Sequence, residues 1–175
     1  DQNASMRCTA GHALLLDCRP ELTPLENVSQ QEFDLDKYNL ELLVVDTQAP
    51  HQLNDGQYAQ RRATCEEAAK ILGVANLRVT ADGISKADDQ FQALKETLDA
   101  LPDETMKKRV RHVVTEIERV RSFVRAFAQG DIKAAGRLFN ASHDSLAADY
   151  EVTVPELDNA VDVARKNGAY GARMT

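Results

Sequence analysis

The chain has 175 residues, of which 43% are hydrophobic and 28% charged, and it carries a formal net charge of −7. These values are ordinary for a soluble globular protein, and the acidic charge argues against nucleic acid as the principal partner, because phosphate contacts need a basic face. No apolar run approaches the ~20 residues that a membrane-spanning helix requires, and the first residues lack the pattern of a secretory leader. We therefore expect neither a nucleic-acid partner nor a membrane partner.

The cysteines, Cys8, Cys18 and Cys65, are odd in number and lack the paired spacing of a zinc site. Cys18 falls within a predicted strand, and Cys65 falls on the inner face of a predicted helix. We expect buried free thiols, which fit a reducing compartment.

Two apolar runs predict strands in the first half of the chain. Residues 13–18 read ALLLDC, and residues 40–46 read LELLVVD; nearly continuous apolar runs of this length are typical of strands covered on both sides. A short helix or turn precedes the first strand, which the chain enters through Gly11. The polar stretch between the runs, residues 21–38, predicts a surface loop with at most one short edge strand.

The middle of the chain predicts two shorter helices. The first begins at the N-cap Asn54 and ends at Leu72, before a glycine. One face of this helix carries Tyr58, Cys65, Ala69 and Leu72. Residues 77–79 then predict a short extended piece, and a second helix is expected from Ser85 to Leu98.

Residues 103–129 predict the longest helix, because an apolar stripe recurs at helical spacing for seven turns. Gly130 and Asp131 should end it and cap the next helix, giving a tight helical hairpin. The basic residues on its other side, which we expect to form a solvated face, are Lys107, Lys108, Arg111, Arg119 and Arg125.

The last stretch, residues 140–175, predicts the end of that second hairpin helix, a linker, another helix and the start of a strand. The inner stripe of the hairpin helix is expected at Leu138, Phe139, Ser142 and Leu146. Thr153 and Glu156 predict a capping box for the final helix, with Pro155 in its first turn. Asn167 and Gly168 should end it, and residues 171–175 begin a strand.

The predicted strands lie in the first part of the chain and the predicted helices in the later part, which indicates an α+β fold. The pattern of elements alone would assign this fold to one domain. The spacing of residues alone does not indicate an enzyme, because the sequence has no Walker loop, no zinc-ligand pair at helical spacing and no glycine-flanked nucleophilic serine. His143 lies next to Asp144, but its place beside a core stripe favours a structural, hydrogen-bonded histidine. His51 and His112 have no obvious carboxylate partner in sequence, and the same interpretation holds for them.

Several ordered strings nevertheless resemble galactokinases, members of the GHMP kinase superfamily. They are SHDSLAADYEVTVPELD at 142–158 followed by GAYGARMT at 168–175, HALLLDCR at 12–19, QYAQRRATCEEAA at 57–69, VRHVVTEIERV at 110–120, and the initial Asp1-Gln2. The resemblance covers nearly the whole chain and is weakest at residues 21–37 and 79–104. It implies a fragment that lacks the family's N-terminal part and its C-terminal glycine-rich loop.

The resemblance also implies an organisation and an activity. Residues 1–50 would be the tail of the N-terminal, ATP-loop domain, and residues 51–175 would be the truncated C-terminal GHMP kinase domain, with helices packed on a mostly antiparallel sheet. The parent would transfer the γ-phosphoryl group of ATP, with Mg²⁺, to the anomeric hydroxyl of α-D-galactose in the cytoplasm. Because the nucleotide-binding groups lie outside this chain, the resemblance implies no cofactor or metal site within it, and the piece alone should neither bind ATP tightly nor turn over.

Two residues of this chain match the family's site. Asp1 matches the aspartate beside the anomeric hydroxyl, regarded as the catalytic base, and a carboxylate ionised at neutral pH can accept that proton. Tyr58 matches a tyrosine that contacts the sugar, although its place on an apolar helix face is also that of a core tyrosine. Arg61 and Arg62 match the family's paired arginines, which we interpret as structural, and Pro50 departs from the basic residue that the family often has there.

Three alternatives stay open. A kinase of a related sugar, such as N-acetylgalactosamine, would use the same scaffold. A galactose-sensing regulator would keep the scaffold without turnover. With the resemblance set aside, the hairpin at 103–146 would be a helical interaction module, marked by a large exposed apolar patch.

Overall fold

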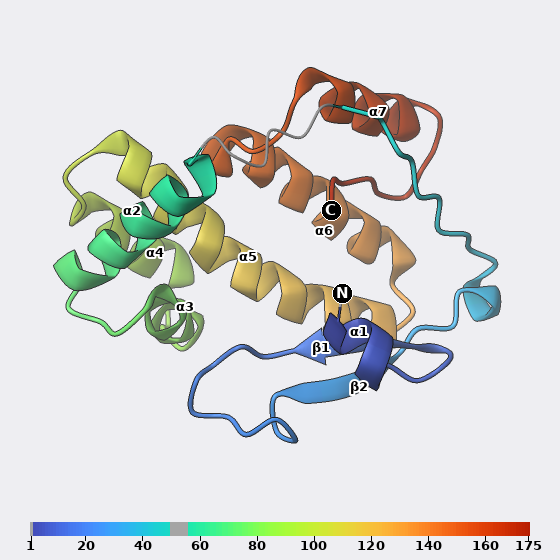
Figure 1. Cartoon of the computed structure of the whole chain (residues 1–175), viewed down its shortest axis with the longest axis horizontal. Coiled ribbons are helices and arrows are strands. Elements are labelled where there is room, and N and C mark those ends of the chain that lie inside the picture. The colour runs from blue at the N-terminus through green and yellow to red at the C-terminus, as the bar shows by residue number, and fades with distance from the viewer. Residues whose placement is uncertain (1, 50–55) are drawn as a thin grey trace.

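The computed structural model describes residues 2–49 and 56–175, and helices dominate it (Figure 1). The helices are α1 (Gln2–Arg7), α2 (Gln57–Ile71), α3 (Leu77–Ser85), α4 (Gln90–Asp99), α5 (Glu104–Ala128), α6 (Ile132–Ser145) and α7 (Pro155–Lys166). The strands β1 (His12–Leu16) and β2 (Val28–Glu32) form an antiparallel pair in which His12 faces Glu32 and Leu16 faces Val28. This is the expected α+β class, with a small sheet.

The predicted helical hairpin is confirmed as α5 and α6. Asp103 caps α5 by accepting a hydrogen bond from the Met106 N–H at 2.9 Å, and α5 ends before Gly130, whose φ of 72° lies in the left-handed region. Asp131 then caps α6 by accepting from the Ala134 N–H at 2.9 Å. The two caps place the helices side by side after a turn of minimal length.

Two clusters of apolar side chains hold the other elements against α5. The larger joins α2, α3 and α5 through Ala68, Ala69, Leu77, Ala81, Leu101, Met106, Val110 and Val114. The smaller lies at the other end of α5, where Phe127 meets Phe33, the residue after β2, with ring centroids 4.7 Å apart. The apolar side chains of α5 at Val110, Val114 and Phe127 are therefore buried in these clusters, whereas Val120 on the same helix is 42% exposed.

The predicted strand at residues 40–46 is wrong. These residues form no helix or strand, and the side chains of Leu43 and Val44 are more than four-fifths exposed, at 83% and 84%. A strand exists only where its N–H and C=O groups find a neighbouring strand, and β1 and β2 pair with each other alone among the described residues.

Two predictions around α3 and α4 are also wrong. Residues 77–79, expected as an extended piece, are the first turn of α3, whose N-cap Asn76 accepts from the Arg78 N–H at 3.1 Å. Ser85, expected to begin a helix, ends α3, and the next helix begins after Asp89. A short apolar run does not distinguish strand from helix, and here the capping side chains decide.

The last helix begins and ends close to prediction, but its cap differs. Val154 is the N-cap and no side chain accepts there, so the Thr153–Glu156 capping box is wrong, whereas Pro155 does occupy the first turn. Gly168, with a φ of 91°, follows the helix as predicted. Residues 171–175 form no strand; the N–H groups of Ala172 and Met174 donate to Asn140 and His143 of α6 instead.

The cysteines are free, as expected, but Cys18 is exposed and follows the end of β1 rather than lying within it. Cys8 and Cys65 are partly buried, and burial raises the pKa of the Cys65 thiol. Predictions that fall on Asn54, Pro50 and His51 lie outside the described residues. Within residues 2–49 and 56–175, no helix has the length and apolar character needed to cross a bilayer.

Candidate active site

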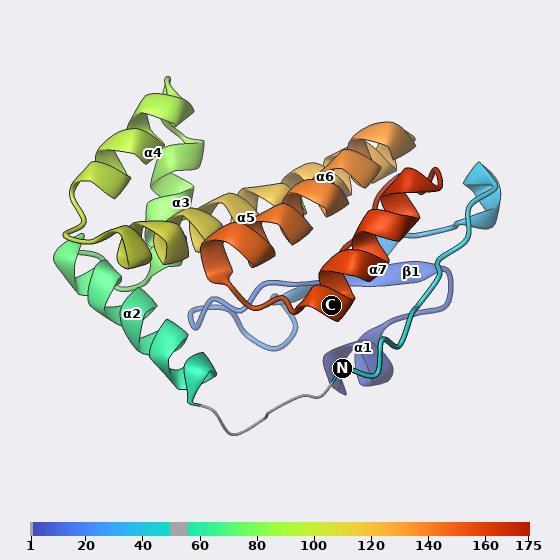
Figure 2. The same cartoon turned by 90° about the horizontal axis from the view of Figure 1, so that it is seen from above.

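Tyr58 lies in the first turn of α2, and 77% of its surface is exposed. The alternative of a core tyrosine is therefore wrong, although Ala69 on the same helix is buried. Figure 2 shows that the start of α2, α1 and the last residues of the chain lie on the same side of the α5–α6 hairpin. Asp1 lies outside the described residues, so the structure does not place it relative to Tyr58.

A π-helical turn, Leu146–Tyr150, connects α6 to the linker before α7. It ends at Glu151, whose φ of 56° lies in the left-handed region that few residues other than glycine adopt. The end of such a turn leaves carbonyl groups without helical partners. Arg61 of α2 supplies two donors, from Nε to the Tyr150 carbonyl at 2.8 Å and from Nη2 to the Glu151 carbonyl. Arg109 of α5 donates to the Asp149 carbonyl.

The Tyr150 ring is the centre of this cluster. The guanidinium groups of Arg61 and Arg109 each lie 5.9 Å from its centroid, within the range of cation–π attraction, and the His112 ring stacks on it at 4.5 Å. Burial raises the pKa of the Tyr150 hydroxyl, and Tyr58 contributes to the rise. The Tyr150 ring is therefore enclosed by side chains from α2 and α5, which fix its position.

Charge pairing fixes the left-handed residue itself. The Glu151 carboxylate accepts from Arg109 Nη2 at 2.6 Å and from Lys108 Nζ at 3.4 Å. The bonds from Arg109 and then Lys108 lower the pKa of Glu151. The Arg109 side chain is only 9% exposed, so it is a buried cation whose partners come from the turn that it stabilises.

His112 begins a buried chain of polar side chains. Its Nδ1 lies 2.9 Å from Ser145 Oγ, and that hydroxyl donates to Asp149 Oδ2 at 3.2 Å. Because a carboxylate can only accept hydrogen bonds, the Ser145 hydroxyl donates its hydrogen to Asp149. The same hydroxyl must therefore accept a hydrogen bond from His112 Nδ1–H. A nucleophilic serine would face the bare nitrogen of its histidine, so this chain is structural, as expected for His112.

Not all of the basic side chains of α5 form the predicted solvated face: Arg125 is 59% exposed, but Arg119 is not. Arg119 is 15% exposed and pairs with Glu116 while donating to Thr115 Oγ1 at 2.8 Å. Arg111 pairs with Asp149 at 2.8 Å. The solvated-face prediction is therefore wrong for Arg119, which is enclosed between α5 and α6.

His143 and Asn140 hold the end of the chain on α6. His143 is 4% exposed; its Nε2 lies 3.1 Å from Asp158 Oδ1 and its Nδ1 accepts from the Met174 N–H at 3.2 Å. Asn140 Oδ1 accepts from the Ala172 N–H and from Arg165 Nε, both at 2.9 Å. The prediction of a structural, hydrogen-bonded His143 is confirmed.

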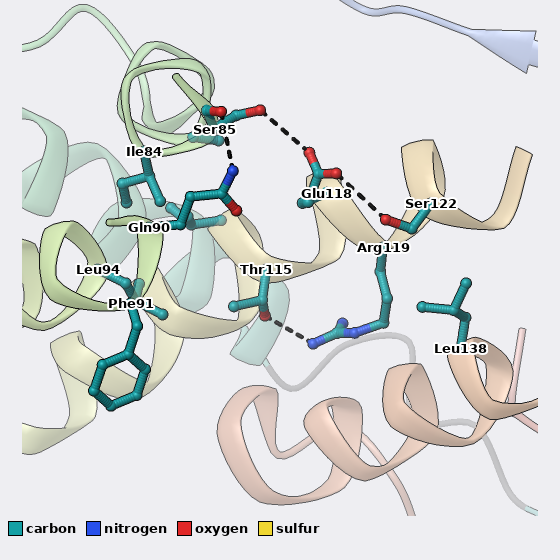
Figure 3. A pocket seen from close by; sticks show the side chains of 12 residues that line it. Ile84, Ser85, Gln90, Phe91, Leu94, Thr115, Glu118, Arg119, Ser122 and Leu138 are labelled. Carbon is teal, nitrogen blue, oxygen red and sulfur yellow. Dashed lines mark hydrogen bonds between the residues drawn. The ribbon is translucent and has the colours of Figure 1, made fainter. Parts of the chain in front are cut away.

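A cavity of about 310 Å³ opens between α3, α4, α5 and α6 (Figure 3). Its walls are mostly apolar, and its charged groups are already engaged: Arg119 points toward Thr115, and Glu118 accepts from Ser122 Oγ at 3.3 Å. It lies on α3 and α4, away from the start of α2. In the part of the chain that the structure describes, no three His, Cys, Asp or Glu side chains converge as metal ligands would.

Sequence reasoning missed Arg109, Glu151 and Asn140. Arg109 had a readable signal, since it lies three residues after Met106 and four before Val113, on the apolar stripe of α5, where a cation needs a buried partner. Glu151 and Asn140 carried none, because their partners are distant in sequence.

Comparison with known proteins places this geometry in context. A family model described as GHMP kinases C terminal matches residues 123–175. All of the chain aligns with a galactokinase of Streptomyces coelicolor at 44% identity, covering 42% of that protein, and with a galactokinase of Bos taurus at 38%, covering 41%. The chain therefore spans about two fifths of the curated relatives that it matches.

A solved structure of a galactokinase is also similar to this chain. The crystal structure of Lactococcus lactis galactokinase complexed with galactose matches with a TM-score of 0.71 and 30% sequence identity, over 94% of this chain and 39% of that chain. The fold of the described residues is thus that of a segment of this relative.

Proposed function

We propose that the whole protein is a galactokinase of the GHMP kinase family, because the GHMP kinases C terminal model matches residues 123–175 and the whole chain aligns with galactokinases. It transfers the γ-phosphoryl group of ATP to the anomeric hydroxyl of α-D-galactose, giving galactose 1-phosphate and ADP. The observation that carries the proposal is the alignment of the entire chain with proteins named galactokinase at 38–44% identity. The likeness to a galactose-bound galactokinase supports galactose as the acceptor.

Two residues carry the proposed sugar chemistry. Asp1 accepts or orients the anomeric hydroxyl proton, a role that suits an ionised carboxylate in a reaction that depends mostly on positioning and charge stabilisation. Tyr58 lays its ring along the sugar and hydrogen-bonds a hydroxyl. The exposure of Tyr58 at the start of α2 supports this role, because its ring is available to a ligand.

ATP and Mg²⁺ are proposed for the whole protein only. The proposal gives neither the ion nor the nucleotide a site on the described residues. We propose that residues 1–50 belong to the N-terminal GHMP kinase domain and residues 51–175 to the C-terminal one. A sugar kinase acting this early in galactose use works in the cytosol.

The test is coupled ADP release by the whole protein with galactose, with N-acetylgalactosamine and with no sugar. We expect galactose alone to drive turnover, and Asp1→Ala to lower kcat about 10²–10⁴-fold, the usual size of a general-base effect. Tyr58→Ala should raise the KM for galactose, while Tyr58→Phe, which keeps the ring, separates the stacking contribution from the hydroxyl contribution.

Other outcomes separate the alternatives. Turnover with N-acetylgalactosamine in preference to galactose would make the protein a kinase of the related sugar. Galactose binding without ADP release would support the sensing regulator. Failure to bind either sugar would overturn the proposal.

A further inference from the structure

We infer that α6 is a template that sets the register of the segment 170–175. Three residues of α6, Gly136, Asn140 and His143, lie at positions i, i+4 and i+7, which share one side of a helix. We call these three the template face. Each of the three contacts a successive part of the segment, so the segment and the helix run side by side in the same order.

The first contact is between backbones. Gly136 lies against Tyr170 and Gly171 so closely that a Cβ added to Gly136 would come within 3.0 Å of the Tyr170 Cβ and closer still to its carbonyl. Gly136 is buried. Only a glycine at this point of α6 lets the segment approach, which fixes where it meets the helix.

The second and third contacts are side-chain acceptors for alternate amides. Asn140 Oδ1 accepts the Ala172 N–H at 2.9 Å, and His143 Nδ1 accepts the Met174 N–H at 3.2 Å. Alternate N–H groups on one side are what an extended chain presents to a neighbouring strand. The helix therefore supplies, through side chains, the hydrogen bonds that a strand edge would otherwise supply.

The spacing of the two partners agrees. The seven residues from Gly136 to His143 advance about 10.5 Å along an α-helix. The three residues from Gly171 to Met174 advance about 10 Å if the chain is extended. A shift of the segment by one residue would turn both amides away from α6 and bring a Cβ against Gly136.

The acceptors are held in place by α7. Arg165 donates from Nε to Asn140 Oδ1 at 2.9 Å and from Nη2 to the Asn140 carbonyl at 2.9 Å, which fixes the orientation of the amide. For His143, the backbone N–H of Met174 only donates and the Asp158 carboxylate only accepts, so Nδ1 is bare and Nε2 carries the proton. Helix α7 thus presents both acceptors in the form that the segment needs.

This step rests on the proposed function: the resemblance to galactokinases implies that a glycine-rich, phosphate-facing loop follows Thr175, and the template face would set the direction in which the chain enters that loop. Asn140 and His143 are positioning residues: they act on the nucleotide through the segment. Their loss should raise the KM for ATP and leave the KM for galactose nearly unchanged.

The experiment is residue-resolved amide hydrogen exchange on the whole protein, combined with sugar-dependent ADP release. Asn140→Ala should speed exchange at the Ala172 amide, and His143→Leu at the Met174 amide, each about tenfold, as expected for one lost hydrogen bond. Asn140→Asp and His143→Asn keep an acceptor at the same position and should hold exchange within about threefold of wild type. The same two truncations should raise the KM for ATP about tenfold and change the KM for galactose less than about twofold.

Val110→Ala is the matched control, since Val110 is fully buried in the larger apolar cluster, which has no member in the segment 170–175. It should destabilise the fold without selective change at the Ala172 and Met174 amides. Unchanged exchange at both amides in the truncated variants, or the same change in Val110→Ala, would overturn the template. The expected exchange at the Ala172 and Met174 amides could be found in a protein that shows no sugar-driven turnover. That result would support the template and refute the proposed function. Turnover with an unaltered KM for ATP would refute the positioning role.

Discussion

Gly136 and Gly171 meet backbone to backbone, so that a Cβ added to Gly171 would lie 2.7 Å from the Cα of Gly136. Real Cβ atoms do not approach other atoms so closely. The contact explains why a glycine stands in the interior of α6, where it weakens the helix relative to alanine by about 1 kcal/mol.

Two glycine substitutions in helices should therefore have opposite effects. Gly83 lies inside α3 and a Cβ there would meet nothing within 4 Å, so Gly83→Ala should stabilise the fold by about 0.5–1 kcal/mol. Gly136→Ala should destabilise it by about 1–3 kcal/mol, because the segment must move away. Chemical denaturation measures both, and changes of the same sign in the two variants would contradict the packing argument.

The stability should fall in mild acid because of His112. Burial lowers the pKa of this histidine below its ordinary value of 6.5. As the pH falls, the unfolded chain takes up the proton first, so the stability is complete above pH 6.5 and is lost as the pH falls from there toward the lower pKa of the folded state. The free energy of unfolding, measured from pH 7.5 to 5.5, should show this slope.

His112→Asn keeps a donor toward Ser145 and removes the titrating group, so it isolates the contribution of His112. The variant should be less stable at pH 7.5, where the stacking on Tyr150 is lost, and its stability should depend less on pH. An unchanged slope would assign the acid sensitivity to other groups.

The adjacent arginines of α2 should differ in importance. Arg61 donates to the Tyr150 and Glu151 carbonyls, and Arg61→Ala should destabilise the fold by about 1.5–3 kcal/mol, as charged hydrogen bonds do. Arg62 pairs with Glu66 at 2.8 Å on the exposed side of the helix, and Arg62→Ala should change the stability by less than about 0.5 kcal/mol. Thermal or chemical unfolding of the two variants checks this, and equal losses would show that the carbonyl contacts of Arg61 do not stabilise the turn.

The exposed run at 42–45 should drive self-association of the 175-residue chain. Leu42, Leu43, Val44 and Val45 are 57–84% exposed in sequence, and apolar extended segments without a partner strand associate. Val44→Lys should lower the apparent mass in light scattering. Leu25→Lys, which alters an isolated leucine that is 88% exposed, is the control, and an equal effect of both variants would exclude a specific role for the run.

The sequence predicted the α5–α6 hairpin well because its signals are local. The apolar stripe of α5 and the Gly130-Asp131 turn act within a few residues, and the structure has both. The predictions for residues 40–46 and 77–79 were wrong because their structure depends on groups outside the run itself. Their apolar composition suits a strand, but the outcome depended on a distant partner in the first case and on the Asn76 cap in the second.

The site was predictable in part. Tyr58 was singled out through the resemblance, and its exposure removes the core alternative, while the roles of Asp1 and Tyr58 stay predictions. The Tyr150 cluster and the template face could not be predicted from the sequence, because their partners are distant along the chain. Arg61, for example, donates to carbonyl groups about ninety residues further on. Such contacts follow from packing and leave no periodic trace.

The matched spacing of α6 and the segment has a consequence for how the chain tolerates insertions and deletions. Deleting one residue between Gly136 and His143 would rotate the rest of α6 by about 100° and separate the glycine from the two acceptors. A residue added in the linker at 152–154 would only lengthen an irregular connection. Variation in length among relatives should therefore gather in that linker and avoid residues 136–143 and 171–174.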